Sequence, residues 1–167
     1  RVFNLSKREA DMAIAVSRPA TGRLTVQRLT DYSLSLAAST SYLAQHKPIT
    51  RLEDLQDHRI IGYIADMIFD KELDYLGQIG LTQVPLASNS VSVQLNWLRH
   101  GAGVGVVHDF ARPSAPELAR ILPEIRLTRS FWLIRHADDG RVARLNRFAD
   151  QLAAGLRKEV LRLEAAA

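Results

Sequence analysis

The sequence predicts an α/β fold with mainly parallel sheets. Segments with helical spacing alternate with short apolar or β-branched runs along all 167 residues. Near the middle, a segment with helical spacing ends at His100 and is followed by glycines and the valine-rich run Val104–Val107. The chain also ends in a long amphipathic segment. Because we find no internal repeat, we expect one α/β arrangement rather than a repeat architecture.

The first part of the chain predicts a helix, a strand, a loop and two more extended segments. Helical spacing within Arg1–Ala10 leads into the apolar run Met12–Val16, which we expect to be a central strand. Pro, Gly and Ser mark Ser17–Gly22 as a loop. Two extended segments then follow, Leu24–Leu29 and Tyr32–Ala38, the second with period-two alternation.

Polar residues that favour helix starts divide the middle of the chain. Ser39 is placed to cap a helix, and Thr50 and Glu53 have the spacing of a capping box that opens a short helix. Arg59–Ile64 reads as a buried strand, and a helix is expected from Asp66. The apolar face of that helix and the glycines that end it are Phe69, Leu73, Leu76, Gly77 and Gly80.

The glycines after His100 are predicted to join a helix to a strand. After the short segment Val84–Ala87, the polar triplet Ser88–Ser90 caps a helix that runs to His100, and the strand Val104–Val107 follows the glycines. A dinucleotide-binding loop requires the opposite order, with the strand before the glycines and the helix after them. Gly101 is therefore expected to adopt a left-handed backbone just past a helix C-terminus.

The last third of the chain predicts a loop, a strand and the closing helix. Three prolines limit Arg112–Glu124 to a loop with a short helical piece around Glu117–Arg120. Phe131–His136 is a strand, and the turn Ala137–Gly140 opens the final helix. The apolar stripe of that helix consists of Val142, Leu145, Phe148, Leu152, Leu156 and Val160.

Composition excludes several classes of site. The chain has no cysteine, its five histidines lack metal-ligand spacing, and it has no Gly-x-Ser-x-Gly motif. We therefore expect no catalytic residue, no metal and no cofactor. The formal charge of +4 raises the question of nucleic-acid binding. However, the arginines are scattered among Asp and Glu, and no DNA-reading motif is found, so solvated faces explain the charge.

Three predicted strand exits indicate a ligand site. They are Tyr63–Ala65, Ser88–Ser90 and Val107–Asp109. In open α/β sheets, ligands bind beyond the carboxyl ends of the strands and against helix N-termini. Backbone N–H groups and short polar side chains at these exits suit a small anion such as a carboxylate. The alternative, that Asn89 and Ser90 only cap their own helix, stays open.

Six segments, in this order, resemble the effector-binding domain of LysR-type transcriptional regulators. They are READMAI (8–14), SLAASTSYLAQH (35–46), LEDLQDHRIIGY (52–63), SNSVSVQLNWLRHGAGVGVV (88–107), RILPEI (120–125) and FWLIRHADDGRVARLNRFADQL (131–152). The resemblance implies two Rossmann-like α/β lobes of the type-two periplasmic-binding-protein kind, the first N-terminally incomplete. Residues 1–20 and 126–167 would form lobe I, and residues 21–125 lobe II. Ser17–Gly22 and the region near Glu124–Arg126 would be the crossovers.

The resemblance also implies a function. The chain would be a cytoplasmic domain that senses a small-molecule effector, performs no chemistry, and has no membrane partner. It would act in a homodimer or homotetramer and control DNA binding by a helix-turn-helix domain outside this sequence. The expected effector contacts are Tyr63, Ile64, Asn89, Ser90, Val107 and His108, with Val16 and Ser17 at the crossover edge.

His108 departs from the pattern of this family, which often has Leu-Pro at the positions of Val107 and His108. We expect this histidine either to contact an acidic effector, which would make binding pH-sensitive, or to face solvent. Two other functions remain open. A free-standing solute-binding protein of a transporter shares the fold, and an upstream secretion signal would favour it. An α/β enzyme with its catalytic residues before Arg1 would require turnover by a complete chain.

Overall fold

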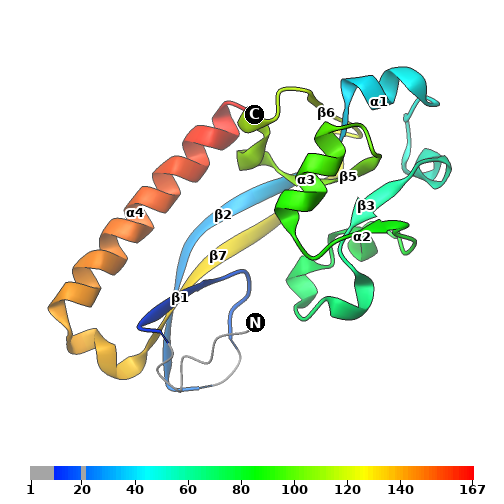
Figure 1. Cartoon of the computed structure of the whole chain (residues 1–167). Coiled ribbons are helices and arrows are strands. Elements are labelled where there is room, and N and C mark those ends of the chain that lie inside the picture. The colour runs from blue at the N-terminus through cyan, green and yellow to red at the C-terminus, as the bar shows by residue number, and fades with distance from the viewer. Residues whose placement is uncertain (1–9, 20–21) are drawn as a thin grey trace. The chain divides into compact units, whose positions relative to one another are not determined.

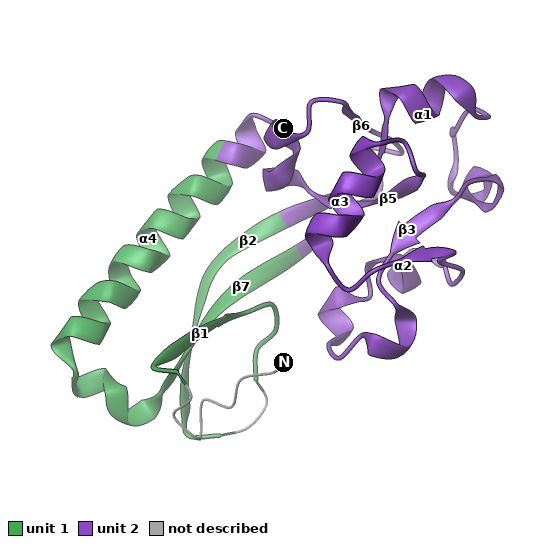
Figure 2. Cartoon of the chain, viewed as in Figure 1, with its two compact units in different colours: residues 1–32, 129–162 green, residues 33–128, 163–167 purple. Residues whose placement is uncertain are grey.

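The computed structural model describes residues 10–19 and 22–167 (Figure 1). The helix expected within Arg1–Ala10 and part of the Ser17–Gly22 loop therefore lie outside the described residues. The chain forms two compact units (Figure 2). Unit 1 takes the chain up to Tyr32 and from Arg129 to Arg162, and unit 2 takes Ser33–Thr128 and Leu163–Ala167. Both long strands, β2 (Leu24–Ser39) and β7 (Arg126–His136), contribute residues to each unit.

Unit 1 combines the strand order β1-β7-β2 with the long helix α4 (Ala143–Ala165). Strand β1 (Met12–Ala15) pairs antiparallel with β7, which places Ile14 opposite Leu133. The prediction of a central strand at this position was wrong, because β1 stands at the end of the strand order among the described residues. The long closing helix is confirmed, and its residues Ala149 and Ala153 join a core cluster with Leu133.

Unit 2 contains the strand order β2-β5-β3-β4, with β6 (Leu118–Arg120) also paired to β2. The short strand β3 (Ile60–Gly62) runs parallel to β5 (Val104–His108) and to β4 (Leu86–Ala87). In contrast, β2 is antiparallel to both β5 and β6. In unit 2, the parallel pairing expected from the sequence is found between β3 and its two neighbours.

Predicted caps set the helix ends of unit 2. The Ser39 hydroxyl accepts a hydrogen bond from the Tyr42 N–H at the start of α1 (Thr40–Gln45). The Ser90 hydroxyl does the same for Val93 at the start of α3 (Val91–Arg99). Gly101 follows α3 with a φ of 72°. A residue with a Cβ disfavours this left-handed backbone, so the prediction of a glycine joint is confirmed.

The helix expected from Asp66 is broken into shorter pieces. The chain forms 3₁₀ turns at Ala65–Met67 and Lys71–Leu73, followed by the single helical turn α2 (Tyr75–Gln78). The physical reason is competition from short acidic side chains. The carboxylates of Asp70 and Asp74 accept backbone N–H groups two and three residues ahead, and each hydrogen bond begins a new turn.

Three other local predictions were wrong in detail. The segments Leu24–Leu29 and Tyr32–Ala38 form the single strand β2, which pairs with β7, β5 and β6. The helical piece expected around Glu117–Arg120 is the strand β6, which pairs with Ala37–Ser39. The helix start at Thr50 uses Asp54 in place of Glu53.

The Asp54 carboxylate accepts the backbone N–H groups of Thr50 and Arg51, at 2.8 and 3.1 Å. These hydrogen bonds and the Thr50 hydroxyl lower the pKa of Asp54 to about 2. The following 3₁₀ helix covers Leu52–Asp57. Its start is therefore held by one acidic side chain that satisfies two free backbone donors.

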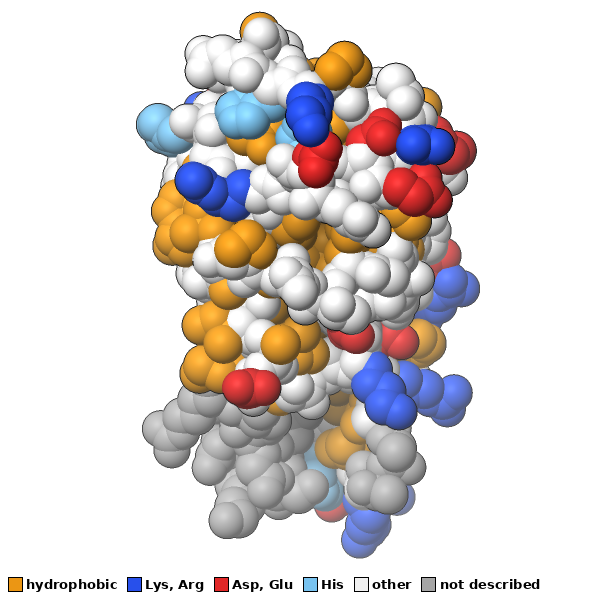
Figure 3. Space-filling model, turned by 90° about the vertical axis from the view of Figure 1, so that its right-hand side faces the viewer, with side chains coloured by type: hydrophobic (Ala, Val, Ile, Leu, Met, Phe, Trp, Pro, Cys, Tyr) orange, Lys and Arg blue, Asp and Glu red, His pale blue; other side chains and the backbone are white. Residues whose placement is uncertain are grey.

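Charged side chains of both signs are interspersed on the face drawn in Figure 3. Lys47 pairs with Asp57 at 2.7 Å and Arg51 with Asp54 at 3.3 Å. Such exposed pairs add little stability, but they break up single-sign patches. Solvated faces therefore account for the charge on this side of the molecule. Among the described helices, none has the length and apolar character needed to cross a membrane.

Candidate ligand-binding site

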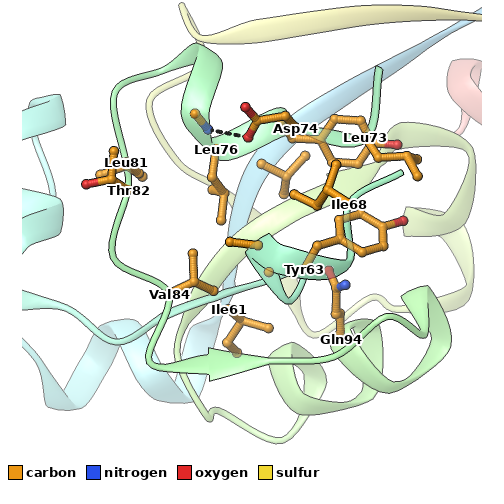
Figure 4. A pocket seen from close by; sticks show the side chains of 15 residues that line it. Ile61, Tyr63, Ile68, Leu73, Asp74, Leu76, Leu81, Thr82, Val84 and Gln94 are labelled. Carbon is orange, nitrogen blue, oxygen red and sulfur yellow. Dashed lines mark hydrogen bonds between the residues drawn. The ribbon is translucent and has the colours of Figure 1, made fainter. Parts of the chain in front are cut away.

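Two cavities in unit 2 lie where β3 and β5 end and α3 begins. The larger has a volume of about 230 Å³ and is shown in Figure 4. The smaller, about 20 Å³, shares four lining residues with it, namely Tyr63, Tyr75, Gln94 and Val106. These cavities occupy the position at which open α/β sheets bind ligands, beyond the carboxyl ends of parallel strands.

The larger cavity is formed by the segment that follows β3 and folds back over it. Leu76 packs so close to Gly62 that a Cβ at this glycine would overlap the leucine side chain. Gly62 therefore lets α2 approach the end of β3. Asp74 holds the first turn of α2 through the Gly77 N–H at 3.0 Å, the hydrogen bond drawn in Figure 4. Local caps and one glycine together shape this wall of the cavity.

Asn89 connects two of the three predicted strand exits. Its Oδ1 accepts the Ile64 N–H at 3.3 Å, across 25 residues of sequence. Ser90 caps α3 instead, and the Ser88 hydroxyl accepts the Ser90 N–H at 3.2 Å. The capping alternative therefore holds for Ser90 but not for Asn89, which ties the segment after β3 to the start of α3.

Aromatic side chains run along the edge of the cavities. Tyr63 meets Tyr75 edge-on with ring centroids 5.9 Å apart, and Tyr75 meets His108 at 6.0 Å. His108 in turn lies 5.1 Å from Phe110. Burial, with contributions from Tyr75, raises the pKa of the Tyr63 phenol above its usual value, so this group is neutral. Edge-to-face packing is one of the arrangements that aromatic rings prefer.

His108 is half-buried and lines the smaller cavity, so the solvent-facing alternative is wrong. Burial lowers its pKa to about 4, and the adjacent Asp109 opposes this shift only in part. The imidazole is therefore neutral near pH 7 and provides no positive charge for an acidic ligand. The pH sensitivity expected from this residue is moved to acidic pH.

A buried carboxylate fixes the segment that leaves β5. The Asp109 side chain is 1% exposed and accepts a hydrogen bond from the Ser35 hydroxyl at 2.6 Å. Arg120 and Arg126 approach its second oxygen at 3.1 and 3.3 Å. Because Asp109 directly follows His108, these contacts with β2, β6 and β7 hold the cavity residue in place.

The structure brings together the site residues predicted within unit 2. Tyr63, Val107 and His108 line the smaller cavity, Asn89 is hydrogen-bonded to Ile64, and Ser90 caps α3. The remaining two, Val16 and Ser17, are half-buried residues that follow β1 in unit 1. Within the described part of the chain, no group of three or more His, Cys, Asp or Glu side chains could hold a metal.

Of the four residues that line both cavities, sequence reasoning named Tyr63 and missed the other three, Tyr75, Gln94 and Val106. A signal existed for Gln94, because it lies three residues after Val91 and four before Leu98, on the predicted apolar face of α3. A polar residue at such a position is expected to be buried with a polar partner. The other two are apolar or aromatic residues that nothing local distinguishes from ordinary core residues.

Comparison with known proteins gives one consistent result. A family model described as the LysR substrate binding domain matches residues 2–157. The regulatory domain of CrgA, a LysR-type transcriptional regulator from Neisseria meningitidis, superposes with a TM-score of 0.77 at 22% identity, covering 92% of this chain and 78% of that one. Sequence comparison with curated proteins gave no significant match.

Two further solved structures show the same fold. AphB from Vibrio cholerae, described as a virulence activator of the LTTR family, gives a TM-score of 0.73 at 18% identity, with 93% of this chain and 55% of AphB covered. The C206S mutant of OxyR from Corynebacterium glutamicum gives a TM-score of 0.68 at 15% identity, with 96% of this chain and 54% of OxyR covered. This chain thus spans about half the length of these two proteins.

Proposed function

Since the chain belongs to the family of LysR substrate-binding domains, we propose that it is the effector-sensing part of a LysR-type transcriptional regulator. The observation that carries the proposal is the pair of cavities at the ends of β3 and β5, beside the α3 N-terminus. Their residues offer binding surfaces and no arrangement of nucleophile and base, so the proposed role is binding without turnover.

The proposed mechanism is a shift between two arrangements of the chain. Residues 1–20 and 126–167 would form one lobe and residues 21–125 the other, with Val16 and Ser17 contributing at the crossover. An effector that binds one arrangement better shifts the equilibrium by its difference in affinity. In a cytoplasmic homodimer or homotetramer, this shift would reposition helix-turn-helix domains on DNA.

The regulator function is tested with the natural gene product in its source cells. Deleting the gene should change a defined set of transcripts, and restoring the wild-type gene should reverse the change. The isolated product should have a mass well above 18.7 kDa and include a helix-turn-helix sequence. A deletion that alters no transcript, together with a product near 18.7 kDa, would overturn the proposal.

The proposed role of Asn89 is tested in the same cells. Asn89→Ala removes the hydrogen bond to the Ile64 N–H and should abolish the restored transcript response while the protein level stays unchanged. Ser90→Ala is the matched control, because this neighbour caps α3. If both variants reduce response and protein level equally, Asn89 contributes to stability alone.

A further inference from the structure

The larger cavity is apolar around most of its wall. The aliphatic residues that line it come from β3, β5, α2 and the loops beside them, and are Ile61, Ala65, Ile68, Leu73, Leu76, Leu81, Val84 and Val106. Tyr63 and Tyr75 complete the wall (Figure 4). Met67 and Phe69, which flank the lining residue Ile68 in the sequence, are also apolar and are 59% and 74% exposed to solvent. Such surroundings favour a ligand with an apolar body.

The wall of both cavities contains no cation to pair with an anionic ligand. Among the described residues that line them there is no Lys or Arg, and the one formal charge is the Asp74 carboxylate. His108 is neutral near pH 7. At the start of α3, Ser88 and Ser90 side chains already accept N–H groups that would otherwise face a ligand. A carboxylate entering here would lose its hydration without a compensating partner.

Gln94 supplies one directed hydrogen-bonding group. It is 6% exposed, and its Nε2 donates to the Ser88 carbonyl oxygen at 2.5 Å, which fixes the orientation of the amide. Among the described residues, its Oε1 has no hydrogen-bond partner. Figure 4 shows the amide directed toward the Tyr63 ring, on the wall of the cavity. An amide oxygen on a cavity wall without a protein partner is available as an acceptor for a ligand donor.

We propose that this cavity takes an uncharged ligand with a planar apolar ring and one O–H or N–H donor, which pairs with Gln94. The proposal deepens the effector-sensing function above and rests on it. The size of the cavity fits such a ligand. A cavity of about 150 Å³ holds benzene, and the volume of about 230 Å³ here leaves room for a substituted ring. This ligand class replaces the small anion expected from the sequence.

Three ring compounds of similar size test the ligand class. Phenol is neutral and has a donor, anisole is neutral without a donor, and benzoate is an anion. Each is titrated into the 167-residue chain near pH 7 and followed by NMR. Phenol should bind at least about tenfold more tightly than benzoate, because no cation offsets the cost of burying the carboxylate. Contacts should appear between ring protons and the methyl groups of Ile68, Val84 and Val106.

Variants separate a specific contact from loss of structure. Gln94→Leu should reduce phenol binding to the level of anisole while anisole binding stays unchanged, which a general loss of stability would not produce. Val106→Phe fills the cavity and should weaken both neutral compounds at least about tenfold. Val93→Phe is the matched control, because Val93 lies on the same unit, is exposed and does not line the cavity.

Several results would overturn the ligand class. They are benzoate binding as tightly as phenol, a phenol preference that Gln94→Leu leaves intact, methyl contacts elsewhere, or no saturable phenol binding. None of these results bears on the transcripts that depend on the gene. Conversely, selective phenol binding by a chain whose deletion changes no transcript would support the cavity and overturn the regulator. The two proposals therefore fail separately.

Discussion

Removing the Asp109 carboxylate should destabilise unit 2 more than any exposed charge does. The side chain is 1% exposed and joins Ser35 of β2 to Arg120 and Arg126. Asp109→Ala deletes all three contacts at once and leaves the Ser35 hydroxyl buried without its partner. The substitution also creates a small void between the end of β5 and its neighbours.

The expected loss follows from the exposure of each partner. The hydrogen bond from the buried Ser35 hydroxyl to a charged group stabilises by about 1.5–3 kcal/mol. The two arginines are 31% and 52% exposed, so they regain water when the carboxylate is lost, and each ion pair contributes only about 0.2–1 kcal/mol. The free energy of unfolding should therefore fall by about 2–5 kcal/mol. Asp109→Asn should cost less, because an amide oxygen can still accept from Ser35.

Urea unfolding followed by circular dichroism measures this loss as a change in midpoint at constant slope. Asp150→Ala is the control, because Asp150 is an exposed carboxylate on α4 that forms no ion pair with the described residues, and its removal should have little effect. A loss below about 1 kcal/mol for Asp109→Ala, or one equal to that of Asp150→Ala, would refute the assigned role.

Three further outcomes follow from individual residues. The pKa of His108 is lowered from 6.5 to about 4, so the unfolded chain binds a proton that the folded chain rejects, and stability falls as pH decreases through this window. As the pH decreases through this window, the free energy of unfolding measured in urea should fall by about 3 kcal/mol more for wild type than for His108→Gln. Equal pH dependence of the two proteins would exclude this contribution from His108. Gly103→Ala should destabilise by at least about 1–3 kcal/mol, because a Cβ would overlap the Arg59 carbonyl oxygen. At Gly155 in α4, an added Cβ would lie in open space. Gly155→Ala should therefore stabilise the helix by about 1 kcal/mol and raise the thermal midpoint, because alanine has the higher helix propensity.

Features that depend on neighbours in sequence were predicted well. Ser39 and Ser90 cap the helices expected of them, and Gly101 has the left-handed backbone expected after α3. Each of these depends on backbone groups within a few residues, so the local pattern is sufficient. The apolar stripe of α4 was also recognised, although Phe148 is 54% exposed and lies off the buried face.

Within the candidate site, the positions were predicted better than the interactions. Tyr63 and His108 were named because they follow predicted strands, and both line the cavity. The shifts of their pKa values were not predicted, because in both residues the main cause is burial in the folded chain. The prediction of a small anion as ligand depended on the polar strand exits alone. The cavity lining without Lys or Arg, which disfavours an anion, forms only when segments distant in sequence come together.

The sequence by itself determined the α/β class, the order of most elements, the helix caps and the family. These are encoded in spacing and in short polar or glycine positions, whose effects extend over only one or two turns. Tertiary structure alone decided the strand directions around β2, the Asn89 contact with Ile64, and the burial of Asp109 against Arg126. These contacts join residues 17 to 74 positions apart in the sequence. Such pairs form only when the strands assemble into the sheet, and no local sequence pattern specifies them.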